Sequence, residues 1–110
     1  MSGSGGGGGS GGGTPTVSDC AKLTKMTTLN SAIPKVVKTL QADDVLAIGL
    51  DSGGSGRVEV RTKQGDLAGS ITYSGVSALR KCIEEGWQFI AIIRSVKGGD
   101  VTVEIRPKAS

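Results

Sequence analysis

The sequence predicts a small α+β domain, built as an antiparallel β-barrel or a strongly twisted sheet with one packed helix. Three observations predict this fold class. Short segments of strand-like apolar patterning follow one another from Val45 to the C-terminal end. Glycine-rich turns separate them. One amphipathic stretch with helical spacing interrupts their succession.

The chain divides by composition into three parts. Residues 1–13 are almost entirely glycine and serine, so we expect a flexible linker or tag remnant, with a native glycine-rich leader as the alternative. Residues 14–42 form an N-terminal arm with a short helix, and residues 43–108 form the barrel-like part. We expect these last two parts to pack together as one domain.

The arm is the least regular part. Pro34 is suited to the first turn of a helix, which predicts a short helix or turn over Pro34–Gln41. Lys22–Leu29 has apolar residues at helical spacing, but its threonines favour a strand. We interpret it as an extra edge strand or a loose arm.

The first two strands of the barrel-like part form a hairpin. Val45–Leu50 is a short apolar run and predicts a buried strand. Arg57–Lys63 alternates, which is typical of a strand with one face on the core and one in solvent. The glycine-rich stretch Asp51–Gly56 predicts the loop between them. Its glycines resemble a phosphate loop, but it opens a strand and lacks the lysine of that motif, so we interpret it as a hairpin.

A third strand and the helix follow. Leu67–Tyr73 predicts a strand in which Gly69 marks a bulge or a close backbone approach. Residues 74–86 predict a helix with Ser74 or Ser77 as its cap and Gly86 at its end. Its apolar face carries Val76, Leu79, Cys82 and Ile83, and its charged face has the spacing of Arg80–Glu84 and Lys81–Glu85 ion pairs.

Two strands complete the domain. Trp87–Val96 is apolar on both faces, as in a strand that is central or covered on both sides, and we expect Trp87 and Phe89 in the core. Lys97–Asp100 predicts a turn. Val101–Arg106 alternates and is expected to be an exposed edge strand. The order of three strands, a helix and two strands is that of a small OB-type barrel; an open sheet crossed by one helix is the rival.

The residue types argue against an enzyme. The chain has no histidine, which excludes a serine–histidine or cysteine–histidine nucleophile and the usual zinc sites. Its aspartates fall mostly in predicted turns, where they bond their own backbone. We therefore expect no catalytic residues, no metal and no cofactor.

The cysteines and the hydropathy suggest a compartment. We interpret Cys20 and Cys82 as reduced in a cytoplasmic protein, with a disulfide between the arm and the helix as the alternative. No segment has the length of a membrane span, and the N-terminus lacks the pattern of a signal peptide.

Charge gives the best sign of a binding face. Lysine and arginine number 13 against 10 acidic residues, for a net charge of +3. Basic side chains recur on the solvent side of neighbouring strands, an arrangement that suits a phosphate backbone, and Tyr73 is the plausible stacking platform for a base. The candidate nucleic-acid-binding residues are Arg57, Arg61, Lys63, Tyr73, Arg94 and Lys97.

Part of the chain resembles a known family. The run Val58–Ile71 with its two glycines, followed by Leu79, Cys82, Ile83 and Gly86, resembles the second half of a HIRAN-type domain. The resemblance spans about Val45 to Arg106 and implies a modified small β-barrel that binds DNA, including single-stranded 3′ ends. The family's Asn-Pro-x-Asp-type stretch is replaced here by Asp51–Gly56, so the family's DNA-end residues do not carry over. The chain also resembles small uncharacterised bacterial proteins.

Two functions follow as hypotheses. The first is a non-catalytic module that binds nucleic acid, single-stranded DNA in particular. The second is a protein-interaction or accessory module, with self-association through the expected edge strand Val101–Arg106 as one form.

Overall fold

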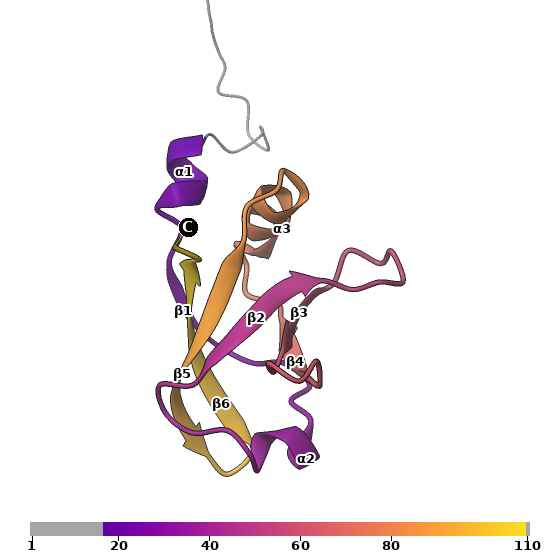
Figure 1. Cartoon of the computed structure of the whole chain (residues 1–110), viewed down its shortest axis with the longest axis vertical. Coiled ribbons are helices and arrows are strands. Elements are labelled where there is room, and N and C mark those ends of the chain that lie inside the picture. Colours follow the sequence, from indigo (N-terminus) through magenta and orange to yellow (C-terminus); the bar gives the residue numbers. More distant parts are fainter. Residues whose placement is uncertain (1–16, 110) are drawn as a thin grey trace, which may run out of the picture.

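The computed structural model describes residues 17–109. They form six strands and three short helices (Figure 1). The strands are β1 (Lys25–Thr28), β2 (Val45–Leu50), β3 (Val58–Arg61), β4 (Leu67–Ile71), β5 (Phe89–Lys97) and β6 (Asp100–Pro107). The helices are α1 (Val17–Ala21), α2 (Pro34–Val37) and α3 (Val76–Glu84). The expected tail, residues 1–13, lies outside the described residues.

All six strands belong to one antiparallel sheet in the order β1-β6-β5-β2-β3-β4, and this sheet curls into a half-barrel. The β2–β3 and β5–β6 hairpins are confirmed. β5 is central, as its apolar sequence predicted, because β2 and β6 pair with its two edges.

The prediction of an exposed edge at Val101–Arg106 is wrong. β1 pairs along β6, with Met26 opposite Glu104 and Thr28 opposite Thr102. The arm therefore supplies the edge strand that the sequence left open. Since β6 has neighbours on both sides, self-association through its backbone has no free edge to use.

The two outermost strands meet at one point and draw the half-barrel together. Asn30, just after β1, exchanges two backbone hydrogen bonds with Ser70 of β4, at 2.8 and 2.9 Å. Gly69 lies beside this junction, where a Cβ would be 3.1 Å from the carbonyl oxygen of Asn30. The register of β4 also shifts against β3 next to Gly69. Both roles predicted for this glycine are confirmed.

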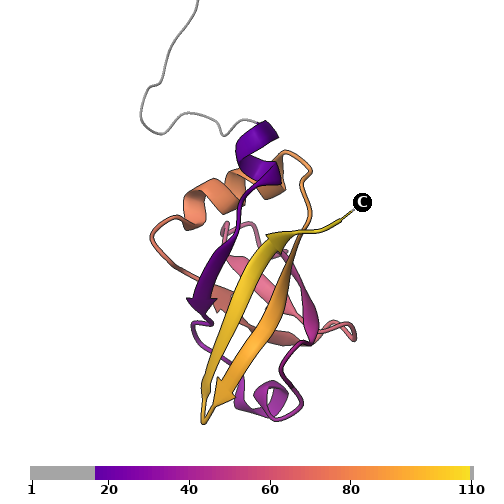
Figure 2. The ribbon, with the colours of Figure 1, turned by 90° about the vertical axis from the view of Figure 1, so that its left-hand side faces the viewer.

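The core fills the inside of the curled sheet. Inward-facing positions alternate along the strands, as expected for side chains of period two. The buried strand residues include Leu46, Ile48, Val58, Val60, Ile71, Phe89, Ala91, Ile93, Val101, Val103 and Ile105. Trp87 is partly buried against this core. α1 and α3 lie at one end of the sheet and α2 lies at the other, as the two views in Figures 1 and 2 show.

α3 follows the predicted range, with a different start. Gly75 occupies the cap position, and no side chain caps the helix, so the expected role of Ser74 or Ser77 is not found. Gly86 follows the last turn with φ of 104°, the left-handed conformation that favours glycine at this place. Leu79 and Cys82 of the predicted apolar face are buried.

The two cysteines are joined, contrary to the interpretation that they are reduced. A disulfide links Cys20 of α1 to Cys82 of α3, with their Cα atoms 5.7 Å apart. Both side chains are fully buried. A helix as short as α1 is marginal by itself, and the bond fastens it to α3. Among residues 17–109, none of the helices has the length and apolarity needed to cross a bilayer.

Candidate functional site

The cations predicted for nucleic-acid binding are spread over different parts of the surface. Arg57 precedes β3, Arg61 ends it, and Lys63 lies in the turn that follows. Arg94 lies on β5, and Lys97 lies at its far end, beside the β5–β6 turn. The structure therefore does not bring these residues together as one patch.

Two of these arginines are held by carboxylates. Arg61 donates a hydrogen bond to Glu59 at 2.9 Å and another to the carbonyl oxygen of Gly65 at 3.0 Å. Arg94 donates to Glu104 at 2.6 and 2.9 Å and to Asp43 at 3.2 Å. Their charges are partly compensated, which weakens their attraction for phosphate.

Glu59 departs from the expected solvent-facing position, because it is 6% exposed. Its neighbours across the sheet, Gly49 and Ser70, are small. Arg61 bonds its carboxylate. A charged group can stay buried when it is paired in this way.

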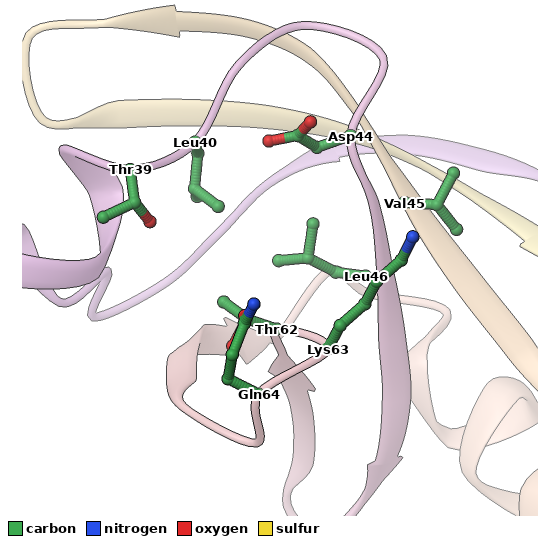
Figure 3. A pocket seen from close by; sticks show the side chains of 8 residues that line it. All are labelled: Thr39, Leu40, Asp44, Val45, Leu46, Thr62, Lys63 and Gln64. Atoms are coloured by element: carbon green, nitrogen blue, oxygen red, sulfur yellow. The ribbon is translucent and has the colours of Figure 1, made fainter.

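Lys63 lies at a separate cleft of about 270 Å³ between α2, the start of β2 and the β3–β4 turn. Figure 3 shows the side chains that line it, with Leu40 and Leu46 as its apolar part and Asp44, Thr62 and Gln64 as polar groups. Gln41 donates its backbone N–H to the Asp44 carboxylate at 2.9 Å. The cleft thus combines one cation and one anion over an apolar floor.

Tyr73 is less open than a stacking platform requires. A Cβ at Gly75 would lie 2.7 Å from its ring, so the ring packs directly on the backbone of that glycine. The ammonium group of Lys25 lies 5.5 Å from the ring centroid, a cation–π distance. Burial raises the pKa of the Tyr73 hydroxyl. Tyr73 precedes α3 in the chain, and its ring is taken up by contacts within the domain.

A hollow of about 380 Å³ opens between the β2–β3 loop, the end of β4 and the first turns of α3. Two arginines from different elements line it: Arg57 from the loop end and Arg80 from α3. Ser55 and Thr72 add hydroxyl groups, and Val58, Ile71 and Val76 form an apolar side. We call this the arginine hollow.

Neither arginine of the hollow forms an ion pair with any of the residues that the structure describes. Arg80 does not reach Glu84 as its helical spacing predicted. It lies instead along the loop, where a Cβ at Gly56 would be 3.4 Å from its Cδ. Arg80, Ser55 and Thr72 are the site residues that sequence reasoning missed. The glycine-rich loop was a signal, but nothing local indicated which helix residue it would meet.

The loop that shapes the hollow is ordered by short-range bonds. Gly54 and Gly56 both have φ of 81°, which a residue with a side chain rarely adopts. The N–H of Asp51 donates to the carbonyl oxygen of Arg57 at 3.0 Å, and the N–H of Arg57 donates to the Ser55 hydroxyl at 3.3 Å. A hydrogen bond with Ser55 is the main cause that holds the pKa of Asp51 below its ordinary value.

No family model matches the sequence, and no curated protein has a similar one. A crystal structure of a protein from Lactobacillus plantarum is similar in fold, with a TM-score of 0.65 and 14% sequence identity. The similarity covers 76% of this chain and 92% of that one. At this level of identity it supports the fold and carries no activity over to this chain. The chain is therefore a small α+β domain whose barrel-like sheet also occurs in the Lactobacillus plantarum protein.

Proposed function

We propose that this chain is a small non-catalytic module that binds nucleic acid, with the arginine hollow as its phosphate-binding site. The observation that carries the proposal is the convergence of Arg57 and Arg80 on one hollow, where neither guanidinium group has a carboxylate of the described residues within ion-pair distance. Asp51 of the same loop attracts Arg57 from farther away. Two like charges that share a hollow repel each other, and an anion between them removes that cost. A guanidinium group is also well matched in shape to a phosphate.

The surroundings of the two arginines fit a nucleotide better than a bare anion. The hydroxyl group of Thr72 adds a neutral hydrogen-bond donor, whereas the Ser55 hydroxyl donates to the Asp51 carboxylate. The apolar side of the hollow offers a surface for a sugar or base. Tyr73 follows Thr72, but its ring packs on Gly75 and beside Lys25 and does not line the hollow.

Single-stranded nucleic acid is the substrate class that we favour. The described helices suit a duplex groove poorly, because α1 and α2 have only five and four residues and the exposed side of α3 carries Glu84 and Glu85. A single strand can place one phosphate in the hollow and turn a sugar or base toward its apolar side.

The test is fluorescence anisotropy of labelled single-stranded DNA, duplex DNA and RNA against the full chain at two salt concentrations. We expect single-stranded DNA to bind most tightly. Each phosphate neutralised adds about 0.7 to the slope of log K against log salt, so two arginines predict a slope of roughly −1.4.

Charge reversal locates the binding site. Arg57→Glu with Arg80→Glu should weaken binding by at least about tenfold, since a hydrogen bond to a charged group contributes about 1.5–3 kcal/mol. Lys35→Glu with Lys38→Glu makes the same change in net charge on two exposed residues, one in α2 and one at its C-terminal end, and α2 lies at the other end of the sheet from α3. Equal losses in both pairs would mean diffuse attraction to the whole surface and would refute the site.

The disulfide bears on where the module acts. The expectation of a cytoplasmic protein rested on reduced cysteines, and the Cys20–Cys82 bond removes that support. Disulfides persist mainly in oxidising compartments. We propose that the functional form is the oxidised one, which mass spectrometry of the alkylated native protein tests directly.

A further inference from the structure

The outer face of the sheet carries an aliphatic cluster that the proposed function does not use. Val45 and Ala47 on β2 lie directly opposite Ile92 and Ile90 on β5. Paired residues of antiparallel strands share a face. Their sequence neighbours Leu46, Ile48, Phe89, Ala91 and Ile93 point into the core, so these four side chains point outward. We call them the aliphatic face.

The described part of the chain leaves this face open. Val45 is 42% exposed, and Ile90 and Ile92 are not among the side chains that pack against the core. The helices lie at the two ends of the sheet and none of them overlies this face (Figures 1 and 2). Met26 of β1 is 52% exposed and lies on the same face, with Glu104 of β6 between it and Ile92. Contiguous exposed apolar side chains of this kind often mark an interaction site.

The charges around the aliphatic face are arranged in two layers. Arg61 lies across from Ala47, and Arg106 lies across from Ile90. Their side chains are 46% and 52% exposed, whereas the carboxylates that pair with them, Glu59 and Glu104, are 8% and 22% exposed. Glu59 and Glu104 are thus more buried than the arginines that they hold, so an approaching molecule meets the guanidinium groups of Arg61 and Arg106 first. The exposed Asp43, which pairs with Arg94, lies at the edge of this face beside the start of β2.

The cleft in Figure 3 continues this surface. Val45 belongs both to the aliphatic face and to the wall of the cleft, and Lys63 lines the same cleft. The buried side chains of Leu40 and Leu46 give it an apolar floor. The cleft is therefore suited to receive one apolar side chain, with a carboxylate beside it that meets Lys63, while the Asp44 carboxylate of the cleft accepts a hydrogen bond from the N–H of Gln41.

We propose that the aliphatic face and this cleft bind a segment of another protein in which apolar side chains alternate with carboxylates. Apolar contacts would supply the affinity, and the arginine layer would select for acidic neighbours. Nucleic acid fits this face poorly, because its described residues include no aromatic side chain for stacking. A second copy fits poorly as well, because an isologous contact would set one arginine layer against the other.

The experiment selects ligands without assuming their sequence. A random-peptide display library is panned against the oxidised full chain, and enriched peptides are synthesised, labelled and titrated. We expect them to be rich in aspartate or glutamate next to leucine, isoleucine or phenylalanine. Val45→Glu and Arg106→Glu should each weaken their binding at least tenfold. Ala78→Glu, an exposed position on α3, should change it by less than twofold.

Thermal unfolding of each variant shows whether it is folded. Three results would overturn the proposal. The first is the absence of any enriched peptide whose binding Val45→Glu weakens. The second is a dimer in sedimentation that Val45→Glu abolishes, which would make a second copy the occupant. The third is loss of single-stranded DNA binding in Val45→Glu, which would assign the face to nucleic acid.

Discussion

Reduction of the Cys20–Cys82 disulfide should destabilise the domain strongly, because the bond closes a long loop. The two cysteines are 62 residues apart. In the chain-entropy description, a loop of this length lowers the entropy of the unfolded chain by about 14 cal/mol/K, which equals about 4 kcal/mol at 25 °C. Small domains have a total free energy of unfolding of about 5–15 kcal/mol. Reduction therefore removes a large fraction of the stability.

Urea unfolding of the oxidised and the reduced chain measures this difference. With m-values of about 1–3 kcal/mol/M, the midpoint should fall by roughly 1–4 M on reduction. The reduced wild-type chain keeps both sulfur atoms in the core. The comparison therefore measures the effect of the crosslink alone, without the loss of packing that a cysteine substitution would add. The Cys20→Ala, Cys82→Ala double variant should not respond to reductant. If reduced and oxidised wild type unfolded within about 1 kcal/mol of each other, the crosslink would not hold the arm as argued.

Three further changes test separate parts of the structure. Gly69→Ala should destabilise the domain by about 1–3 kcal/mol, because the new Cβ meets the segment that closes the sheet. Gly49→Ala is the matched control, since a Cβ there has no atom within 4 Å. Equal urea midpoints for the two variants would contradict the reasoning. Ser55→Ala should raise the pKa of Asp51 toward 3.8. Asp51 stabilises the fold at pH values above its ordinary pKa, and this stabilisation is lost as the pH falls through its lowered pKa. The variant should therefore lose less stability on acidification. NMR titration of the Asp51 carboxyl group and acid unfolding measure the two effects. Arg94→Ala should cost no more than about 1 kcal/mol, since its ion pairs are partly exposed; a larger loss in chemical denaturation would show that they are structural.

Local pattern was sufficient to predict most of the elements. β2 to β6, the two hairpins and the end of α3 at Gly86 follow from alternation, turn residues and a helix-ending glycine, all of which act within a few residues. The short helix from Pro34 is confirmed but ends at Val37. Its N-terminal proline was a local signal, whereas no local residue indicated that it ends before Leu40, which is buried in the core.

Contacts between distant segments could not be predicted in the same way. The pairing of β1 with β6 joins residues that are far apart in sequence, and the threonine-rich arm carries no sign of its partner. The disulfide depends on the same placement of the arm. The burial of Glu59 depends on small neighbours on two other strands.

The candidate site shows the same division. Arg57 was recognised because it begins an alternating strand. Arg80 was assigned to a solvated helix face, and only the folded loop brings it to the arginine hollow. The sequence already places Glu59 and Glu104 among the candidate cations, which weakens the case for a binding face. That they pair with Arg61 and Arg94 follows only from the strand register.

The most direct test of the central claim is an NMR titration of the ¹⁵N-labelled chain with a short single-stranded oligonucleotide. The account predicts that the largest amide shifts cluster at 54–58 and 72–80, the segments that line the arginine hollow. Saturable shifts confined to these segments would support phosphate binding there. Shifts centred on Val45 and Ile92, or no shifts at low salt, would contradict it.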